Sequence, residues 1–265
     1  MMRFVILVAV VCGLVIGVGA VQADTCTFDV PSGDWDVLEN WDCVVGGEQV
    51  PTAADRAVIQ SGKICNIDSP AVADSLEVES TATLNILAGH KLTLDGDNDD
   101  STIDGTLTIT ASGEDVGELA FVDNTQTISG DFFGKIVGLD EAAKITVALG
   151  ITLTNRTTIE GALQITGTGD FKNGGTVHAN TSGTLEITTG LLDDEPAGFW
   201  QVSTSSSAVL HLAAQNTFLL DGSFTILTGI LTADAPGFMT FGDLTMKGGA
   251  IEMPQGAIAV FKYSP

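Results

Sequence analysis

Residues 82–110 read ATLNILAGHKLTLDGDNDDSTIDGTLTIT, and related sequence returns twice further along the chain. The second copy covers 143–166 and the third covers 208–226, so the copies begin about 60 residues apart. Self-similarity at a fixed period is typical of repeat architectures, in which each unit buries its apolar face against its neighbours. The repeat therefore predicts the class of fold more directly than it predicts a function.

Short segments with β character make up each copy. Leu84-Asn85-Ile86, Leu163-Gln164-Ile165 and Leu210-His211-Leu212 each place apolar residues two apart with a polar residue between them. This period of two directs one face of a strand inward and the other outward. Successive segments often lie 22 to 25 residues apart, and no long stretch has helical periodicity. We therefore predict an all-β fold, a right-handed parallel β-helix (β-solenoid) over 61–265 with three degenerate repeats of about 60 residues.

The first 23 residues have the features of a secretory signal peptide. Arg3 precedes an apolar run, and Val21-Gln22-Ala23 is a small-residue pattern suited to cleavage before Asp24. The alternative is an uncleaved membrane anchor, since the run is close to the lower limit for spanning a bilayer. No second long apolar run follows. We expect a secreted protein, extracellular or at the cell surface, with no membrane span after cleavage.

Residues 24–60 differ from the array that follows and are predicted to form an N-terminal cap. They contain Trp35 and Trp41, which we expect to fill the interior of the cap rather than to bind a ligand. Three cysteines remain after cleavage, and an exported chain can oxidise them. The spacing allows a disulfide between Cys26 and Cys43 or between Cys43 and Cys65, and the sequence does not choose between the two.

The chain is strongly acidic, with a formal net charge of −24. Such a polyanion repels nucleic acid and anionic membrane surfaces, so neither is expected as a partner. Cations and cationic surfaces are the partners that such a negatively charged chain would attract. An equally good interpretation is that the charge keeps an exposed β protein soluble and discourages pairing between strand edges.

Four sequence features stand out in the N-terminal part: Trp35 with Asn40-Trp41, the segment at 50–55 (VPTAAD), and the segments at 75–78 (SLEV) and 82–86 (ATLNI). Together they resemble secreted bacterial right-handed β-helix surface proteins of the pectin-lyase-like and autotransporter-passenger type. The resemblance covers about 26–110. It implies an exported β-helix and implies no particular reaction.

The acidic segment at 95–100 (DGDNDD) is the sharpest local feature. Asp95, Asp97, Asp99 and Asp100 present carboxylates at close spacing, and such oxygen ligands suit Ca²⁺. The segment lacks the glycine and the glutamate that an EF-hand loop requires, so only a generic calcium loop is predicted, against the alternative of a solvated acidic turn. The acid–glycine pairs at 104–105, 160–161 and 221–222 are interpreted as equivalent turns of the three copies.

No catalytic set converges in the sequence. His90, His178 and His211 are far apart, and no serine or cysteine stands in a recognisable nucleophile motif. Phe199-Trp200 is expected to fill the core rather than to form a surface aromatic patch. We expect a non-enzymatic structural or adhesive protein of the bacterial cell surface, whose partners are extracellular polysaccharide, other surface proteins or further copies of itself. The alternative is a calcium-dependent carbohydrate-active β-helix.

Overall fold

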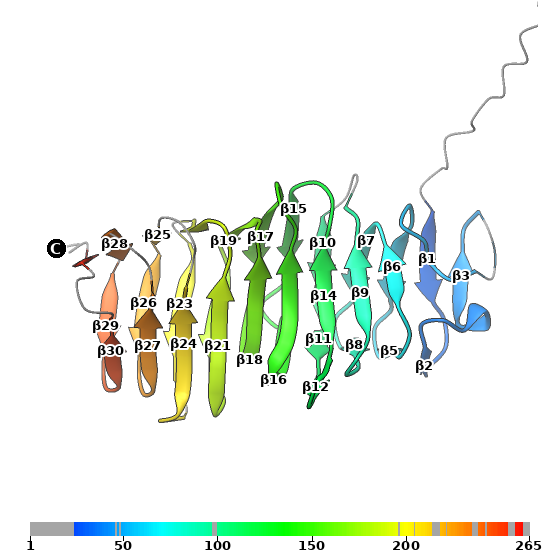
Figure 1. The fold of residues 1–265 in the computed structure, drawn as a ribbon. Helices are drawn as coiled ribbons and strands as arrows, with labels where there is room; N and C mark the ends of the chain where they lie inside the picture. Colours follow the sequence, from blue (N-terminus) through cyan, green and yellow to red (C-terminus); the bar gives the residue numbers. More distant parts are fainter. Residues whose placement is uncertain are drawn as a thin grey trace, which may run out of the picture.

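The computed structural model describes residues 24–45, 47, 49–96, 100–195, 197–203, 205–213, 218–220, 222–234, 238–241, 243–253 and 258–261. Over these residues the chain forms a parallel β-solenoid of about eight turns, with one 3-10 helix, η1 (Leu38–Asn40). Figure 1 shows a single elongated stack in which the colour changes steadily along the axis, so neighbours in space belong to successive coils. The predicted solenoid is confirmed, and the hand of its coil stays a prediction.

Each full coil contributes strands to three columns, which are called columns I, II and III. Column I contains β1 (Thr25–Phe28), β4 (Arg56–Ile59), β7 (Ser75–Val78), β10 (Ser101–Ile103), β15 (Gln126–Ser129), β17 (Thr152–Arg156), β19 (Asp170–Asn173), β22 (Leu192–Asp194), β25 (Phe218–Leu220), β28 (Phe238–Phe241) and β31 (Ile258–Phe261). Column II contains β2 (Ser32–Asp34), β5 (Ile64–Ile67), β8 (Thr83–Ile86), β11 (Thr106–Ile109), the first parts of β16 (Lys135–Val147) and β18 (Thr158–Gly167), β20 (Thr176–Ala179), β23 (Phe199–Val202), β26 (Ser223–Ile226) and β29 (Leu244–Met246). Column III contains β6 (Ala71–Ala73), β9 (Lys91–Leu94), β14 (Glu118–Phe121), the last parts of β16 and β18, β21 (Gly183–Thr188), β24 (Ala208–Leu212), β27 (Ile230–Ala233) and β30 (Ala250–Glu252).

Two strands join columns II and III into one sheet. Because β16 and β18 run through both columns, these columns form a 17-stranded sheet, whereas column I belongs to a separate 12-stranded sheet. A short hairpin of β12 (Ala111–Ser112) and β13 (Asp115–Val116) stands apart from both. Among the described residues no helix has the length and apolar character needed to cross a membrane.

The core consists of rows of buried side chains that occupy the same register position in successive coils. On the inner side of column II, each buried side chain stacks on its counterpart one coil away. This row runs through Cys65, Leu84, Leu107, Ile136, Ile159, Val177, Trp200 and Phe224, all buried. The rings of Trp200 and Phe224 stack with centroids 5.6 Å apart. Trp200 is thus a core residue, as expected from the sequence.

The three sequence copies do not occupy equivalent places in the coil. Leu84 lies in column II, whereas Ile145 and Leu210, at the equivalent positions of the second and third copies, lie in column III. The cause is the variable length of the corners, because register partners are 18 residues apart at Leu153 and Phe171 but 32 apart at Gly33 and Cys65. The structural repeat is therefore the single coil.

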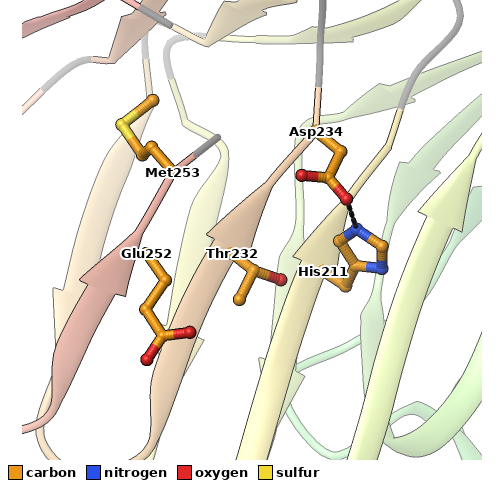
Figure 2. A pocket seen from close by; sticks show the side chains of 5 residues that line it. All are labelled: His211, Thr232, Asp234, Glu252 and Met253. Carbon is orange, nitrogen blue, oxygen red and sulfur yellow. Dashed lines mark hydrogen bonds and ion pairs between the residues drawn. The ribbon is translucent and has the colours of Figure 1, made fainter. Parts of the chain in front are cut away.

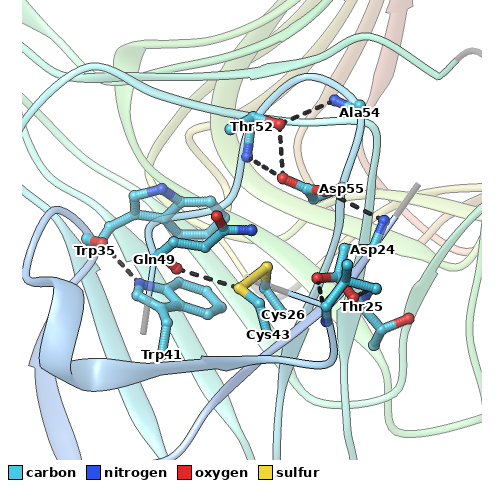
Figure 3. The surroundings of a disulfide bond; sticks show 11 residues. Asp24, Thr25, Cys26, Trp35, Trp41, Cys43, Gln49, Thr52, Ala54 and Asp55 are labelled. Atoms are coloured by element: carbon cyan, nitrogen blue, oxygen red, sulfur yellow. Dashed lines mark hydrogen bonds between the residues drawn. A yellow bond between two sulfur atoms is a disulfide. The ribbon is translucent and has the colours of Figure 1, made fainter. Parts of the chain in front are cut away.

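The N-terminal segment 24–60 is held by a disulfide and an aromatic cluster (Figure 3). Cys26 of β1 is joined to Cys43 of β3 (Trp41–Cys43), which pairs antiparallel with β1 at the edge of the column I sheet. Trp35 and Trp41 are buried edge-to-face, with centroids 4.7 Å apart, and the Trp41 indole donates to the Trp35 carbonyl. Their expected interior position is confirmed. The capping role of this segment stays a prediction.

Cys65 is the remaining cysteine of the described residues, and its thiol is unpaired and buried. It belongs to the inner row of column II, between Gly33 and Leu84. Burial raises the pKa of the Cys65 thiol far above its usual range. Of the two pairings that the sequence left open, Cys26 with Cys43 is the one formed.

Candidate functional site

The acidic segment follows β9 at the corner between columns III and I. Asp95 is half-buried, and its N–H donates to the Ala73 carbonyl 3.0 Å away. Asp100 is exposed, and its carboxylate accepts a hydrogen bond of 2.9 Å from the Thr127 N–H of the next coil. Asp97 and Asp99 lie outside the described residues. The described part of the segment ties one coil to the next, and the calcium site stays a prediction.

Most of the described lysines and arginines form ion pairs with acids on other coils. Arg56 pairs with Glu77 one coil away, and Arg156 reaches Glu195 two coils away at 2.9 Å. The hydrogen bond from Arg156 lowers the pKa of the Glu195 carboxyl. Further pairs join Lys91 with Glu118, Lys135 with Glu160, and Lys172 with Asp193. These cations are matched to acids of the same surface, so they form no cationic track for an anionic polymer.

His178 and Ser203 form a contact that resembles a nucleophile with its base. His178 Nε2 lies in close hydrogen-bonding contact with Ser203 Oγ, which also accepts from Gln201 Nε2 at 3.0 Å. Burial lowers the pKa of His178, an effect that the charge of Glu160 opposes. Ser203, however, is only 2% exposed, so a substrate has little access to its hydroxyl. The contact fits a structural role at the corner after β23.

Phe132 and Phe133 are an exposed aromatic pair that the sequence analysis missed. They are 93% and 76% exposed, and their rings meet edge-to-face with centroids 5.5 Å apart. The turn that carries them is well ordered by hydrogen bonds, because the Asp131 carboxylate accepts from the N–H groups of Phe133 and Gly134 at 2.7 and 2.9 Å. Two adjacent phenylalanines between Asp131 and Gly134 were a usable sequence signal, and they mark a surface apolar patch.

The most developed polar site surrounds His211 on the outer face of column III (Figure 2). Register places Glu186, His211, Thr232 and Glu252 on four successive strands, β21, β24, β27 and β30. The outward position of His211, which the strand alternation predicts, is confirmed. Asp234 follows β27 and turns back toward the imidazole.

Two carboxylates flank the imidazole of His211. Its Nδ1 lies 3.3 Å from Glu186 Oε1, and its Nε2 lies 3.1 Å from Asp234 Oδ2. Beside this pair is an open pocket of about 370 Å³. The residues that line it are His211, Thr232, Asp234, Glu252 and Met253. The pocket combines one imidazole, two carboxylates, a hydroxyl and a thioether, a set that suits a cationic ligand.

Comparison of the chain with family models, with curated proteins and with solved structures finds no match. Functional conclusions therefore rest on the fold, the charges and the contacts described above.

Proposed function

We propose that this chain is a non-catalytic structural or adhesive protein that is exported to a bacterial cell surface. The observation that carries the proposal is the uninterrupted stacking of column I from β1 to β31. The eleven described strands of column I, spaced 4.7–4.9 Å apart, give a stack about 48 Å long. A stack of this kind holds its surface groups at fixed spacings along one axis, which suits spacing or adhesion.

The surface chemistry supports the same proposal. Basic side chains such as Lys91 and Lys135 pair with acids on neighbouring coils, and the net charge of −24 disfavours anionic partners. The exposed Phe132–Phe133 pair offers an apolar contact of the kind that adhesion uses. The signal peptide predicted over 1–23 supports export, and the resemblance at 26–110 supports a bacterial surface protein.

Two measurements on cells producing the full-length chain test the proposal. The first is antibody labelling of intact and lysed cells, which we expect to give equal signal. Labelling only after lysis would contradict a surface location.

The second measurement incubates the exported protein with neutral, acidic and cationic polysaccharides, with Ca²⁺ and with chelator. We expect retention on a surface polymer or on the producing cells, without release of new sugar ends. Product formation that chelator abolishes would overturn the non-catalytic proposal and favour a calcium-dependent carbohydrate-active protein.

A further inference from the structure

The imidazole of His211 is oriented by a carboxylate on the preceding coil. Glu186 Oε1 lies 3.3 Å from Nδ1, close enough to accept a proton from this nitrogen in the tautomer whose lone pair is on Nε2. Histidines that bind metals usually have this arrangement, with the second ring nitrogen donating to a carboxylate. The nitrogen that faces Asp234 is then available as a ligand.

His211 Nε2 and Asp234 Oδ2 are separated by a distance that one metal ion can bridge. The two atoms are 3.1 Å apart. Ligand distances of 2.0–2.2 Å from each atom to an ion place the ligand–metal–ligand angle at about 97°, between octahedral and tetrahedral values. No backbone movement is needed for both atoms to bind the same ion.

The open side of this pair has room for further ligands. The pocket of about 370 Å³ is bordered by the Thr232 hydroxyl and by the exposed Glu252 side chain, two strands away from His211. Asp234 is also largely exposed, at 63% of its side chain, so both carboxylates can adjust their rotamers. The residues that line the pocket include three potential anionic or imidazole ligands and no lysine or arginine.

We propose that His211 and Asp234 bind a divalent transition-metal ion such as Zn²⁺, with water and, after a change of its side-chain rotamer, the Glu252 carboxylate completing the coordination. An imidazole ligand favours Zn²⁺, Ni²⁺ or Cu²⁺ over Ca²⁺ and Mg²⁺, which take oxygen ligands. The ion offsets the repulsion among Glu186, Asp234 and Glu252. This site is separate from the acidic segment at 95–100 and does not depend on the adhesive function.

The test is metal titration of the exported protein, purified after expression of the full-length chain and stripped of metal. Zn²⁺ binding is followed by calorimetry and Co²⁺ binding by visible absorption, in physiological salt with excess Mg²⁺, which competes for diffuse binding to a polyanion. We expect one saturable site and a Co²⁺ spectrum typical of a nitrogen- and oxygen-coordinated ion.

Three variants and one control locate the ion. His211→Gln and Asp234→Asn should each weaken Zn²⁺ binding at least tenfold, and Glu186→Gln should weaken it about tenfold through the lost orientation of the ring. His90→Gln, in the turn before β9, should bind as the parent does. All four side chains are at least partly exposed, and thermal unfolding of each variant checks that the fold is intact.

Two outcomes would overturn the proposal. One is binding that excess Mg²⁺ abolishes, which would mean diffuse attraction of cations only. The other is a His211→Gln variant that retains the parent affinity, which would leave the His211–Asp234 contact as an ordinary ion pair.

Discussion

Replacing Asn173 by alanine tests whether buried amides lock successive coils together. Asn155 and Asn173 are fully buried at one register position of column I. The side-chain oxygen Oδ1 of Asn173 accepts from Asn155 Nδ2 at 2.9 Å and from the Gly175 N–H at 3.3 Å. The Nδ2 of Asn173 donates to the backbone carbonyl of Phe199 at 3.3 Å. Alanine removes all three hydrogen bonds and leaves the Gly175 N–H without its acceptor.

The expected cost follows from these contacts. A net contribution of about 1 kcal/mol per hydrogen bond, with a further penalty for buried groups left unsatisfied, gives a loss of about 2–4 kcal/mol in the free energy of unfolding. Asn85 provides a matched control, because it belongs to a half-buried amide pair with Asn66 on the outer face of column II. Water can replace that single bond of 3.0 Å, so Asn85→Ala should cost less than about 1 kcal/mol.

Urea unfolding of the purified protein, with its disulfide intact, measures both variants. Because stacked repeats need not unfold in one step, amide hydrogen exchange at Gly175 and Thr157 gives the local stability beside the ladder. We expect faster exchange at these amides in the Asn173 variant alone. Equal urea midpoints and equal exchange for the two variants would refute the locking role of the buried ladder.

Three further predictions concern other parts of the chain. Removing the disulfide with Cys26→Ser and Cys43→Ser should lower the stability of the N-terminal segment by about 3 kcal/mol, since it closes a loop of 17 residues; unchanged exchange rates over 24–60 would contradict this. Phe132→Ser should change the unfolding free energy by less than about 0.5 kcal/mol and shorten retention on a hydrophobic column, whereas a large loss of stability would show that Phe132 belongs to the core. Because the pKa of His178 is lowered in the folded state, the unfolded chain binds the proton first as pH falls below about 6.5, so stability should decline there. His178→Gln should reduce that decline, and an identical pH profile for parent and variant would exclude His178 as its source.

Much of the fold could be predicted because the strand pattern is local. The alternation in Leu84-Asn85-Ile86 fixes which side chains point inward, and the same rule predicted the outward position of His211. The connections between strands were predicted less accurately, because they depend on corners of unequal length. Glu160, interpreted as a turn residue equivalent to Asp104, instead lies within β18 and pairs with Lys135. Asp221 lies outside the described residues.

The candidate site depends on the register between coils, which could not be predicted from the sequence. Asp234 follows His211 by 23 residues and meets it only because one full coil, which contains β25 and β26, brings β27 alongside β24. The choice of Cys26 over Cys65 as the partner of Cys43 has the same origin, because β3 folds back onto β1 whereas Cys65 points into the core of column II. Local pattern predicted the faces of the strands, and the corners decided which residues meet.

The short separation along the chain between register partners has a consequence for how the chain folds. Partners in parallel strands lie only 18 to 32 residues apart along a chain of 265, so the relative contact order is about 0.1, close to that of helical bundles and low for a β protein. Each coil can therefore close on the one before it as soon as a few tens of residues are available. Under the export proposed above, the stack would grow from its N-terminus in the same order, with the disulfide-linked first coil as the template for every later one.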